Sequence, residues 1–218
     1  MEPFTTHTGK VAVLDWTDVN TDLIIPARYL KRVERVGYGP LLFADKRYLP
    51  GGAPEADKPT EHGPVDPDFF LNKPESQGAT ILVVRKNFGC GSSREHAVWA
   101  VAQAGFRAVI APVKGEGFAD IFEGNAYGNG LLPIELPIEE WETIAQAGNG
   151  AEVTIDLQAL KLTLHGKAGD QTFTIDVPET QRHRLLNGLD AIAETLLDEP
   201  AISSHEAQAP AWITPQPA

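Results

Sequence analysis

The sequence has one cysteine and one methionine among 218 residues, and few histidines. The single cysteine, Cys90, excludes an internal disulfide framework and favours a cytoplasmic location. A zinc site or an iron–sulfur cluster needs several cysteine or histidine ligands, and the six histidines show no H-x-H or H-x-x-x-H spacing. We therefore expect this chain to bind no metal on its own residues.

Basic side chains are also scarce: 18 lysines and arginines stand against 30 aspartates and glutamates, a formal net charge of −12. Nucleic-acid phosphates need a basic face, so this balance argues against a nucleic-acid partner. No apolar run approaches the roughly 20 residues that span a bilayer, and the N-terminus lacks the pattern of a secretory signal. We expect a soluble protein without a membrane partner, in which local positive charge would have to bind any anionic substrate.

Strand and helix patterns alternate through the middle of the chain. The apolar run Ala79–Val84 predicts a strand, and a glycine-rich turn then leads to a helix predicted over Glu95–Ala104. Further strands are predicted at Arg107–Pro112 and Leu131–Leu136, with a short amphipathic helix between them. This β-α-β-α-β order predicts an α/β fold with a parallel sheet.

The flanking segments predict one domain over residues 1–218. Gly9–Trp16 is typical of a first strand, and two segments after residue 150 alternate apolar and polar residues as antiparallel strands do. Pro50–Gly78 contains six prolines and four glycines, which predicts a long irregular loop. A helical extension is predicted from about residue 178. The expected sheet is therefore mixed, with a parallel core.

The stretch NFGCGSSREHA, Asn87–Ala97, concentrates the residues that could carry chemistry. A strand, a glycine-rich turn and a helix together present backbone N–H groups and the positive end of a helix dipole to an anion. Arg94 can bind a carboxylate through two N–H groups, and Gly89 and Gly91 let the backbone approach a ligand closely. An arginine beside a helix N-terminus is unfavourable unless an anion binds there. The combination predicts a carboxylate site with a serine hydroxyl, that of Ser92, beside it.

Two common motifs do not fit this loop. As a dinucleotide fingerprint, GCGSSR has Arg94 at the third glycine position, and no acidic residue ends the next strand. As a G-x-S-x-G nucleophile elbow, it has Glu95 where the second glycine should stand. A Rossmann site and a serine-hydrolase elbow are both disfavoured.

A structural interpretation of Ser92 competes with the chemical one. SSRE has the spacing of a capping box, with Ser92 at the N-cap of the helix and Glu95 at its third position. Ser93 and Arg94 would then occupy the first helical positions. The local sequence leaves both interpretations open, capping and chemistry.

Three further side chains, those of Cys90, His96 and Asp22, also have alternative interpretations. Cys90 as a nucleophile would need a paired histidine, and His96 is better interpreted as a packed or hydrogen-bonding support. Asp22 could form an Asx turn or belong to the site.

Four segments of the chain resemble the small subunits of 3-isopropylmalate dehydratase, a branch of the aconitase superfamily. They are DVNTDLIIPARYLKR, NFGCGSSREHA, FADIFEGNAYGNGLLPI and LLNGLDAIAETLLDEPAISSHEAQAPAW. The resemblance runs from about Gly9 to Trp212. It implies a swivelling domain of the aconitase C-terminal type, a three-layer β/β/α arrangement that closes on a large subunit.

The resemblance also implies a reaction and roles for residues. The two subunits together would act as a hydro-lyase that interconverts 2-isopropylmalate and 3-isopropylmalate in leucine biosynthesis, with a [4Fe–4S] cluster on the large subunit and no cofactor on this chain. Ser92 matches the position of the catalytic base. Ser93 and Arg94 match residues that hold a substrate carboxylate, and Asp22 and Gly91 line the same site.

The chain departs from the family pattern at two positions. Gly117 stands where the family usually has serine, and Val98 where it usually has proline. Two alternatives to the implied function stay open. One is the small subunit of a homoaconitase- or citraconate-type hydro-lyase, which would act on another 2-hydroxy dicarboxylate. The other is a non-catalytic module that binds dicarboxylates.

Overall fold

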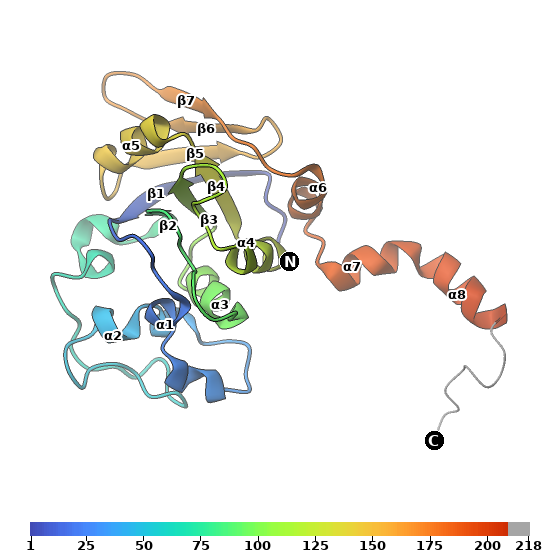
Figure 1. Cartoon of the computed structure of the whole chain (residues 1–218), viewed down its shortest axis with the longest axis horizontal. Coiled ribbons are helices and arrows are strands. Elements are labelled where there is room, and N and C mark those ends of the chain that lie inside the picture. The colour runs from blue at the N-terminus through green and yellow to red at the C-terminus, as the bar shows by residue number, and fades with distance from the viewer. Residues whose placement is uncertain (209–218) are drawn as a thin grey trace.

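A seven-stranded mixed sheet forms the centre of the fold (Figure 1). The computed structural model describes residues 1–208, and its strand order is β4-β3-β2-β1-β5-β6-β7. Strands β1 to β4 pair in parallel, whereas β5, β6 and β7 pair antiparallel. The strands are β1 (Thr6–Leu14), β2 (Ala79–Val84), β3 (Ala108–Pro112), β4 (Leu132–Leu136), β5 (Glu152–Asp156), β6 (Lys161–Leu164) and β7 (Gln171–Thr174). The predicted α/β fold, a mixed sheet with a parallel core, is confirmed.

Burial follows the two kinds of strand. All five residues of β3 are buried, as expected for a strand of a parallel sheet that is covered on both faces. In β5 and β6 buried residues alternate with more exposed ones, so one face of the antiparallel part meets solvent.

Helices and 3-10 turns connect the strands and cover the sheet. The α-helices are α1 (Thr21–Ile24), α2 (Ala44–Arg47), α3 (Glu95–Gln103), α4 (Asp120–Gly128), α5 (Ile138–Ala147), α6 (Glu179–Asn187), α7 (Ala191–Thr195) and α8 (Glu199–Gln208). The 3-10 turns are η1 (Ala27–Lys31), η2 (Gly39–Leu41), η3 (Phe70–Asn72), η4 (Pro74–Ser76) and η5 (Leu196–Asp198). Helices α3 and α4 connect β2 to β3 and β3 to β4, as the order of the patterns predicts.

Two hydrophobic cores lie on opposite faces of the sheet. Neighbouring residues of a strand point to opposite faces, so Leu82 joins one core and Ile81 the other. The first core also takes in α3 and much of the segment between β1 and β2, and the second contains Trp141 and Ile144 of α5. The candidate loop after β2 therefore starts from a strand that is buried on both sides.

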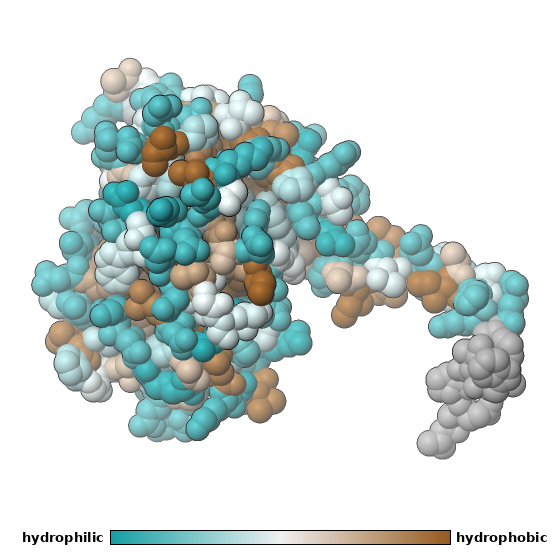
Figure 2. Space-filling view, in the orientation of Figure 1, coloured by the Kyte–Doolittle hydropathy of each residue, from teal (hydrophilic) through white to brown (hydrophobic). Residues whose placement is uncertain are grey.

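The segments outside the sheet are irregular or helical. Residues 50–78 contain only the short turns η3 and η4 and no regular helix or strand. Helices α7 and α8 extend away from the rest of the molecule (Figure 1). Together with the turn η5 between them, they expose apolar side chains, and Figure 2 shows brown patches along this arm; the exposed apolar side chains are Ile192, Leu196, Leu197 and Ile202. The last ten residues of the predicted extension, Trp212 among them, lie outside the described part. No helix within residues 1–208 is long and apolar enough to cross a membrane.

Trp141 gives a direct test of the second core. Its side chain is 2% exposed, and truncation to alanine leaves a cavity that costs about 3–5 kcal/mol of unfolding free energy. Denaturant unfolding of Trp141→Ala should show this loss. The control variant Glu142→Ala, at the exposed residue next to Trp141, should stay within about 0.5 kcal/mol of the wild type. Equal effects of the two variants would contradict the assignment of Trp141 to the core.

Candidate active site

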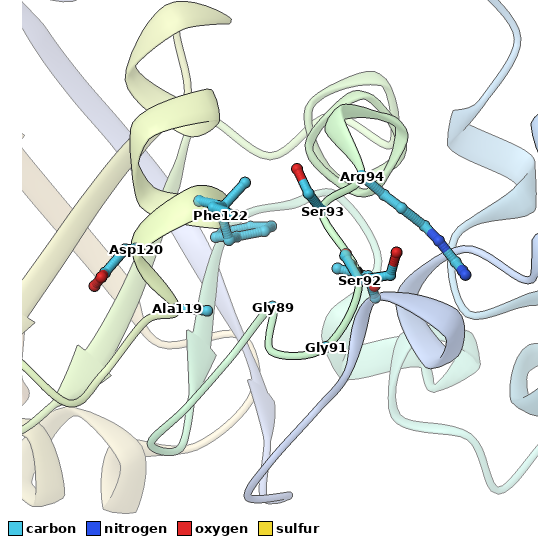
Figure 3. Close-up of a pocket in the computed structure, with 10 residues that line it drawn as sticks. Gly89, Gly91, Ser92, Ser93, Arg94, Ala119, Asp120 and Phe122 are labelled. Carbon is cyan, nitrogen blue, oxygen red and sulfur yellow. Dashed lines mark hydrogen bonds between the residues drawn. The ribbon is translucent and has the colours of Figure 1, made fainter.

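The segment Asn87–Arg94, here called the glycine loop, follows β2 and lies against the start of α1 (Figure 3). The backbone N–H of Thr21 donates to the carbonyl of Cys90 at 2.9 Å. The Thr21 hydroxyl donates to the carbonyl of Ser92 at 2.8 Å, and Thr21 itself is 2% exposed. A buried side chain thus anchors the backbone of the loop at Ser92.

The start of the glycine loop is held from the other side by the turn before α4. The N–H groups of Asn87 and Phe88 donate to the carbonyls of Glu116 and Gly117, at 2.8 and 2.9 Å. The N–H of Ala119 donates in return to the carbonyl of Phe88 at 3.0 Å. Two segments far apart in the sequence therefore flank the loop and set its path.

Gly89 is required by space as well as by backbone conformation. Its φ of +79° lies in the left-handed region, which side chains disfavour. A Cβ at this position would lie 2.4 Å from the ring of Phe122 on α4. Only glycine allows α4 to approach the loop this closely.

Helix α3 begins at Glu95 with Arg94 as its N-cap, so the capping box predicted for Ser92 is wrong. The backbone of Arg94 is extended, with φ −141° and ψ 104°, and no side chain caps the helix. The physical reason is the anchor at Thr21, which binds the carbonyls of Cys90 and Ser92 and so holds this part of the chain beside α1. Ser93 and Arg94 consequently precede the first helical position instead of occupying it. The hydroxyls of Ser92 and Ser93 belong to exposed residues and are not used to cap the helix.

Arg94 and Asp22 lie together. The Nη1 group of Arg94 donates to Oδ1 of Asp22, and the arginine side chain is 14% exposed. The N-cap of α1 is Asn20, whose Oδ1 accepts from the N–H of Leu23 at 2.8 Å. Since Asn20 caps α1, the carboxylate of Asp22 is available for the ion pair.

The glycine loop and the start of α4 line one pocket of about 220 Å³. The lining residues are Thr21, Gly89, Gly91, Ser92, Ser93, Arg94, Ala119, Asp120, Ile121 and Phe122. In Figure 3 the hydroxyl of Ser93 is turned to the side of α4, while Arg94 extends in the opposite direction, away from that helix. Asp22 is not a lining residue and reaches the pocket only through Arg94.

Two parts of this pocket are absent from the sequence predictions. One is Thr21, whose hydroxyl bond spans 71 positions and has no local signature. The other is the start of α4, whose N-cap, Ala119, has no capping side chain. A topological signal for α4 exists, because helices that follow neighbouring parallel strands begin at the same edge of the sheet.

His96 and Cys90 have surroundings that favour supporting roles. The ring of His96 lies 5.5 Å from that of Tyr38 and 4.7 Å from that of Trp99, and burial lowers its pKa. Burial also raises the pKa of the Cys90 thiol, and the charge of Asp18 adds to the rise. A neutral imidazole packed among aromatic rings and a protonated thiol do not form a nucleophile–base pair.

Comparison with known proteins identifies the family. Residues 1–139 match the aconitase C-terminal domain family. The chain is 49% identical over 211 residues to the 3-isopropylmalate dehydratase small subunit of Teredinibacter turnerae, an alignment that covers 95% of this chain and 94% of the relative. The chain belongs to the 3-isopropylmalate dehydratase small-subunit family. The resemblance seen in its motifs is thereby confirmed.

Two further relatives agree with this membership. The chain is 47% identical over 215 residues to the small subunit of the same name from Shewanella amazonensis, covering 97% of this chain and 99% of that one. The crystal structure of a 3-isopropylmalate dehydratase (leuD) from Methanocaldococcus jannaschii superposes with a TM-score of 0.62 at 28% identity, covering 93% and 99% of the two chains. The small-subunit family and the aconitase C-terminal fold are therefore established together.

Substitution of Gly89 tests the geometry of the pocket. In Gly89→Ala, the new methyl group displaces the Phe122 ring or the loop, and we expect a loss of about 1–3 kcal/mol in unfolding free energy. The matched variant Gly124→Ala lies on α4 where a Cβ meets nothing within 4 Å, and it should be neutral or stabilising by about 0.5–1 kcal/mol. Denaturant unfolding measures both. A neutral Gly89→Ala would contradict the close packing of loop and helix.

His96 predicts a pH dependence of stability. Its pKa is lowered in the folded state from the ordinary 6.5, so the unfolded chain binds more protons and folding stability falls as the pH drops below about 6.5. His96→Phe keeps an aromatic ring and removes the titration. The stability of the wild type minus that of His96→Phe should therefore decrease between pH 7.5 and pH 5.5 in unfolding titrations. A difference that stays constant or grows over this range would contradict the partly buried, neutral imidazole.

Proposed function

We propose that this chain is the small subunit of a 3-isopropylmalate dehydratase and that it acts only together with a large subunit. The observation that carries the proposal is the pocket that Ser92, Arg94 and the uncapped start of α4 line together. Kinship at 49% identity with a subunit of this name supports the same reaction. The pair would interconvert 2-isopropylmalate and 3-isopropylmalate by loss and re-addition of water.

The substrate carries two carboxylates, and the pocket offers two kinds of anion partner. The guanidinium of Arg94 has five N–H donors. Asp22 accepts from only one of its nitrogens, Nη1, so other N–H groups remain for a ligand carboxylate. The start of α4 adds free backbone N–H groups and the positive end of a helix dipole. We assign one substrate carboxylate to Arg94 and Ser93. Gly91 leaves room for the ligand to approach the backbone.

Ser92 is assigned the role of base. Its oxygen takes the proton from the carbon next to the one that bears the hydroxyl, the C–H electron pair becomes the new double bond, and hydroxide leaves. Rehydration reverses these steps, except that the hydroxyl now adds to the carbon that lost the proton and the proton to the carbon that lost the hydroxyl. A serine hydroxyl has a pKa far above 7, so its alkoxide needs stabilisation by nearby positive charge. Arg94 and the N–H groups of the glycine loop supply that stabilisation once water is excluded.

Assistance to the departing hydroxyl is assigned to the large subunit. This chain provides one cysteine, Cys90, so its own residues do not form the ligand set of a [4Fe–4S] cluster. Bound in the large subunit, that cluster supplies Lewis-acid assistance to the departing hydroxyl. The pocket of about 220 Å³ is smaller than the roughly 300–1,000 Å³ of typical ligand sites, in keeping with a site that a second subunit completes.

The proposal places both subunits in the cytoplasm, with neither a nucleic acid nor a membrane as partner. The net charge of −12 and the single cysteine support this placement.

The base assignment is tested in the reconstituted pair with its cluster intact. Ser92→Ala removes only the proton-accepting oxygen, so we expect kcat for 2-isopropylmalate to fall by about 10²- to 10⁴-fold with little change in KM. Thr174→Ala removes an exposed hydroxyl on β7 and should leave kcat unchanged. Full activity of Ser92→Ala would show that another group is the base.

The substrate is tested with the same wild-type pair and several 2-hydroxy diacids. The highest kcat/KM for 2-isopropylmalate supports the proposal. A clear preference for another diacid would favour the homoaconitase- or citraconate-type alternative. Binding of diacids without turnover would favour the non-catalytic module.

A further inference from the structure

Both carboxylate oxygens of Glu135, on β4, accept hydrogen bonds from the turn Val113–Gly117, which precedes α4. Its Oε2 accepts from the N–H of Gly115 at 2.5 Å, and its Oε1 accepts from the N–H of Gly117 at 2.8 Å. A carboxylate that bridges two backbone donors of one turn fixes the shape of that turn. Glu135 is not among the residues that line the pocket.

Gly117 and Glu135 are matched in space. A Cβ on Gly117 would lie 2.8 Å from Oε1 of Glu135 and 2.7 Å from the Cβ of Ala111. No side chain fits at position 117 without a shift, and the carboxylate of Glu135 occupies part of the space. This explains in physical terms why glycine is favoured at position 117 of this chain.

The turn held by Glu135 is the one that holds the glycine loop. The carbonyls of Glu116 and Gly117 accept the N–H groups of Asn87 and Phe88, at 2.8 and 2.9 Å. A chain of contacts therefore runs from Glu135 through the turn to the first residues of the loop. Every link is a hydrogen bond of 2.5 to 2.9 Å or a peptide unit.

The turn has a backbone conformation that needs outside support. Val113 adopts a φ of +65°, which β-branched residues strongly disfavour. The nearby cation Lys114 is paired with Asp176. Partial burial raises the pKa of the Glu123 carboxyl, and the charge of Glu135 adds to the rise. Glu135 thus stands near another acid, and its two hydrogen bonds to the turn act against this unfavourable electrostatic interaction.

We propose that Glu135 is a positioning residue for the reaction. Its carboxylate fixes the turn before α4, and the turn fixes the start of the glycine loop. The loop thereby holds Ser92 and Arg94 in their positions in the pocket. The proposal rests on the function proposed above. It assigns to Glu135 no contact with substrate.

The test uses the reconstituted pair with Glu135→Ala, Glu135→Gln and the matched control Glu142→Ala. Displacement of reacting groups by about 1 Å can cost up to about 10²-fold in rate, so we expect kcat of Glu135→Ala to fall at least about tenfold. Glu135→Gln keeps one oxygen acceptor but places an NH2 group against the second N–H donor, so its kcat should lie between those of Glu135→Ala and the wild type. Glu142→Ala, an exposed acid on α5, should match the wild type.

Two further readouts separate positioning from a general loss of structure. The thermal midpoint of each variant and its yield of assembled pair are measured, and kcat is calculated per assembled pair. The proposal expects kcat per pair to fall while most of the protein stays folded and assembled. A kcat per pair within twofold of the wild type, or a loss in Glu135→Gln as deep as in Glu135→Ala, would overturn it. A wild-type pair inactive on every diacid would overturn the proposed function, and this proposal with it.

Discussion

The site depends on one constraint: the glycine loop takes its path from hydrogen bonds to its neighbours. Its glycines have positive φ angles, and the N–H groups of Gly91 to Arg94 donate to no acceptor within residues 1–208. Order comes from Thr21 on one side and from the turn before α4 on the other. These two supports stand at the carboxyl ends of parallel strands, which the sheet places side by side. The sheet thus places the two supports, and the supports set the path of the glycine loop.

The electrostatics of the pocket follow from the same arrangement. Arg94 is mostly shielded from water, and a buried guanidinium needs an anion partner; Asp22 provides it in the free chain. The hydroxyls of Ser92 and Ser93 belong to exposed residues. Under the proposed function, closure by a large subunit would supply the water-free environment that a Ser92 alkoxide needs.

Much of this could be predicted from the sequence, and the failures have a common cause. Apolar runs and glycine-rich turns located β2, β3 and β4, and the start of α3 at Glu95 was correct. Gly91, Ser92, Ser93 and Arg94 line one pocket, and Asp22 contacts it through Arg94. The N-cap at Ser92 was wrong because a hydrogen bond from Thr21, 71 positions away, overrides the local capping pattern. Local patterns carry no information on such long-range bonds, and the supporting roles of Thr21 and Glu135 are hidden for the same reason.

The central claim is that hydrogen bonds from its neighbours hold the glycine loop in place before any ligand or partner binds, while the N–H groups of Gly91 to Arg94 donate to no acceptor within residues 1–208. Amide hydrogen exchange of the isolated wild-type chain, resolved to single residues, tests it most directly. The account predicts slow exchange at Thr21, Phe88 and Gly89, whose N–H groups donate to backbone carbonyls, and fast exchange at Ser92 and Ser93. Fast exchange at Thr21, Phe88 and Gly89 would contradict a loop that is positioned in advance by its neighbours.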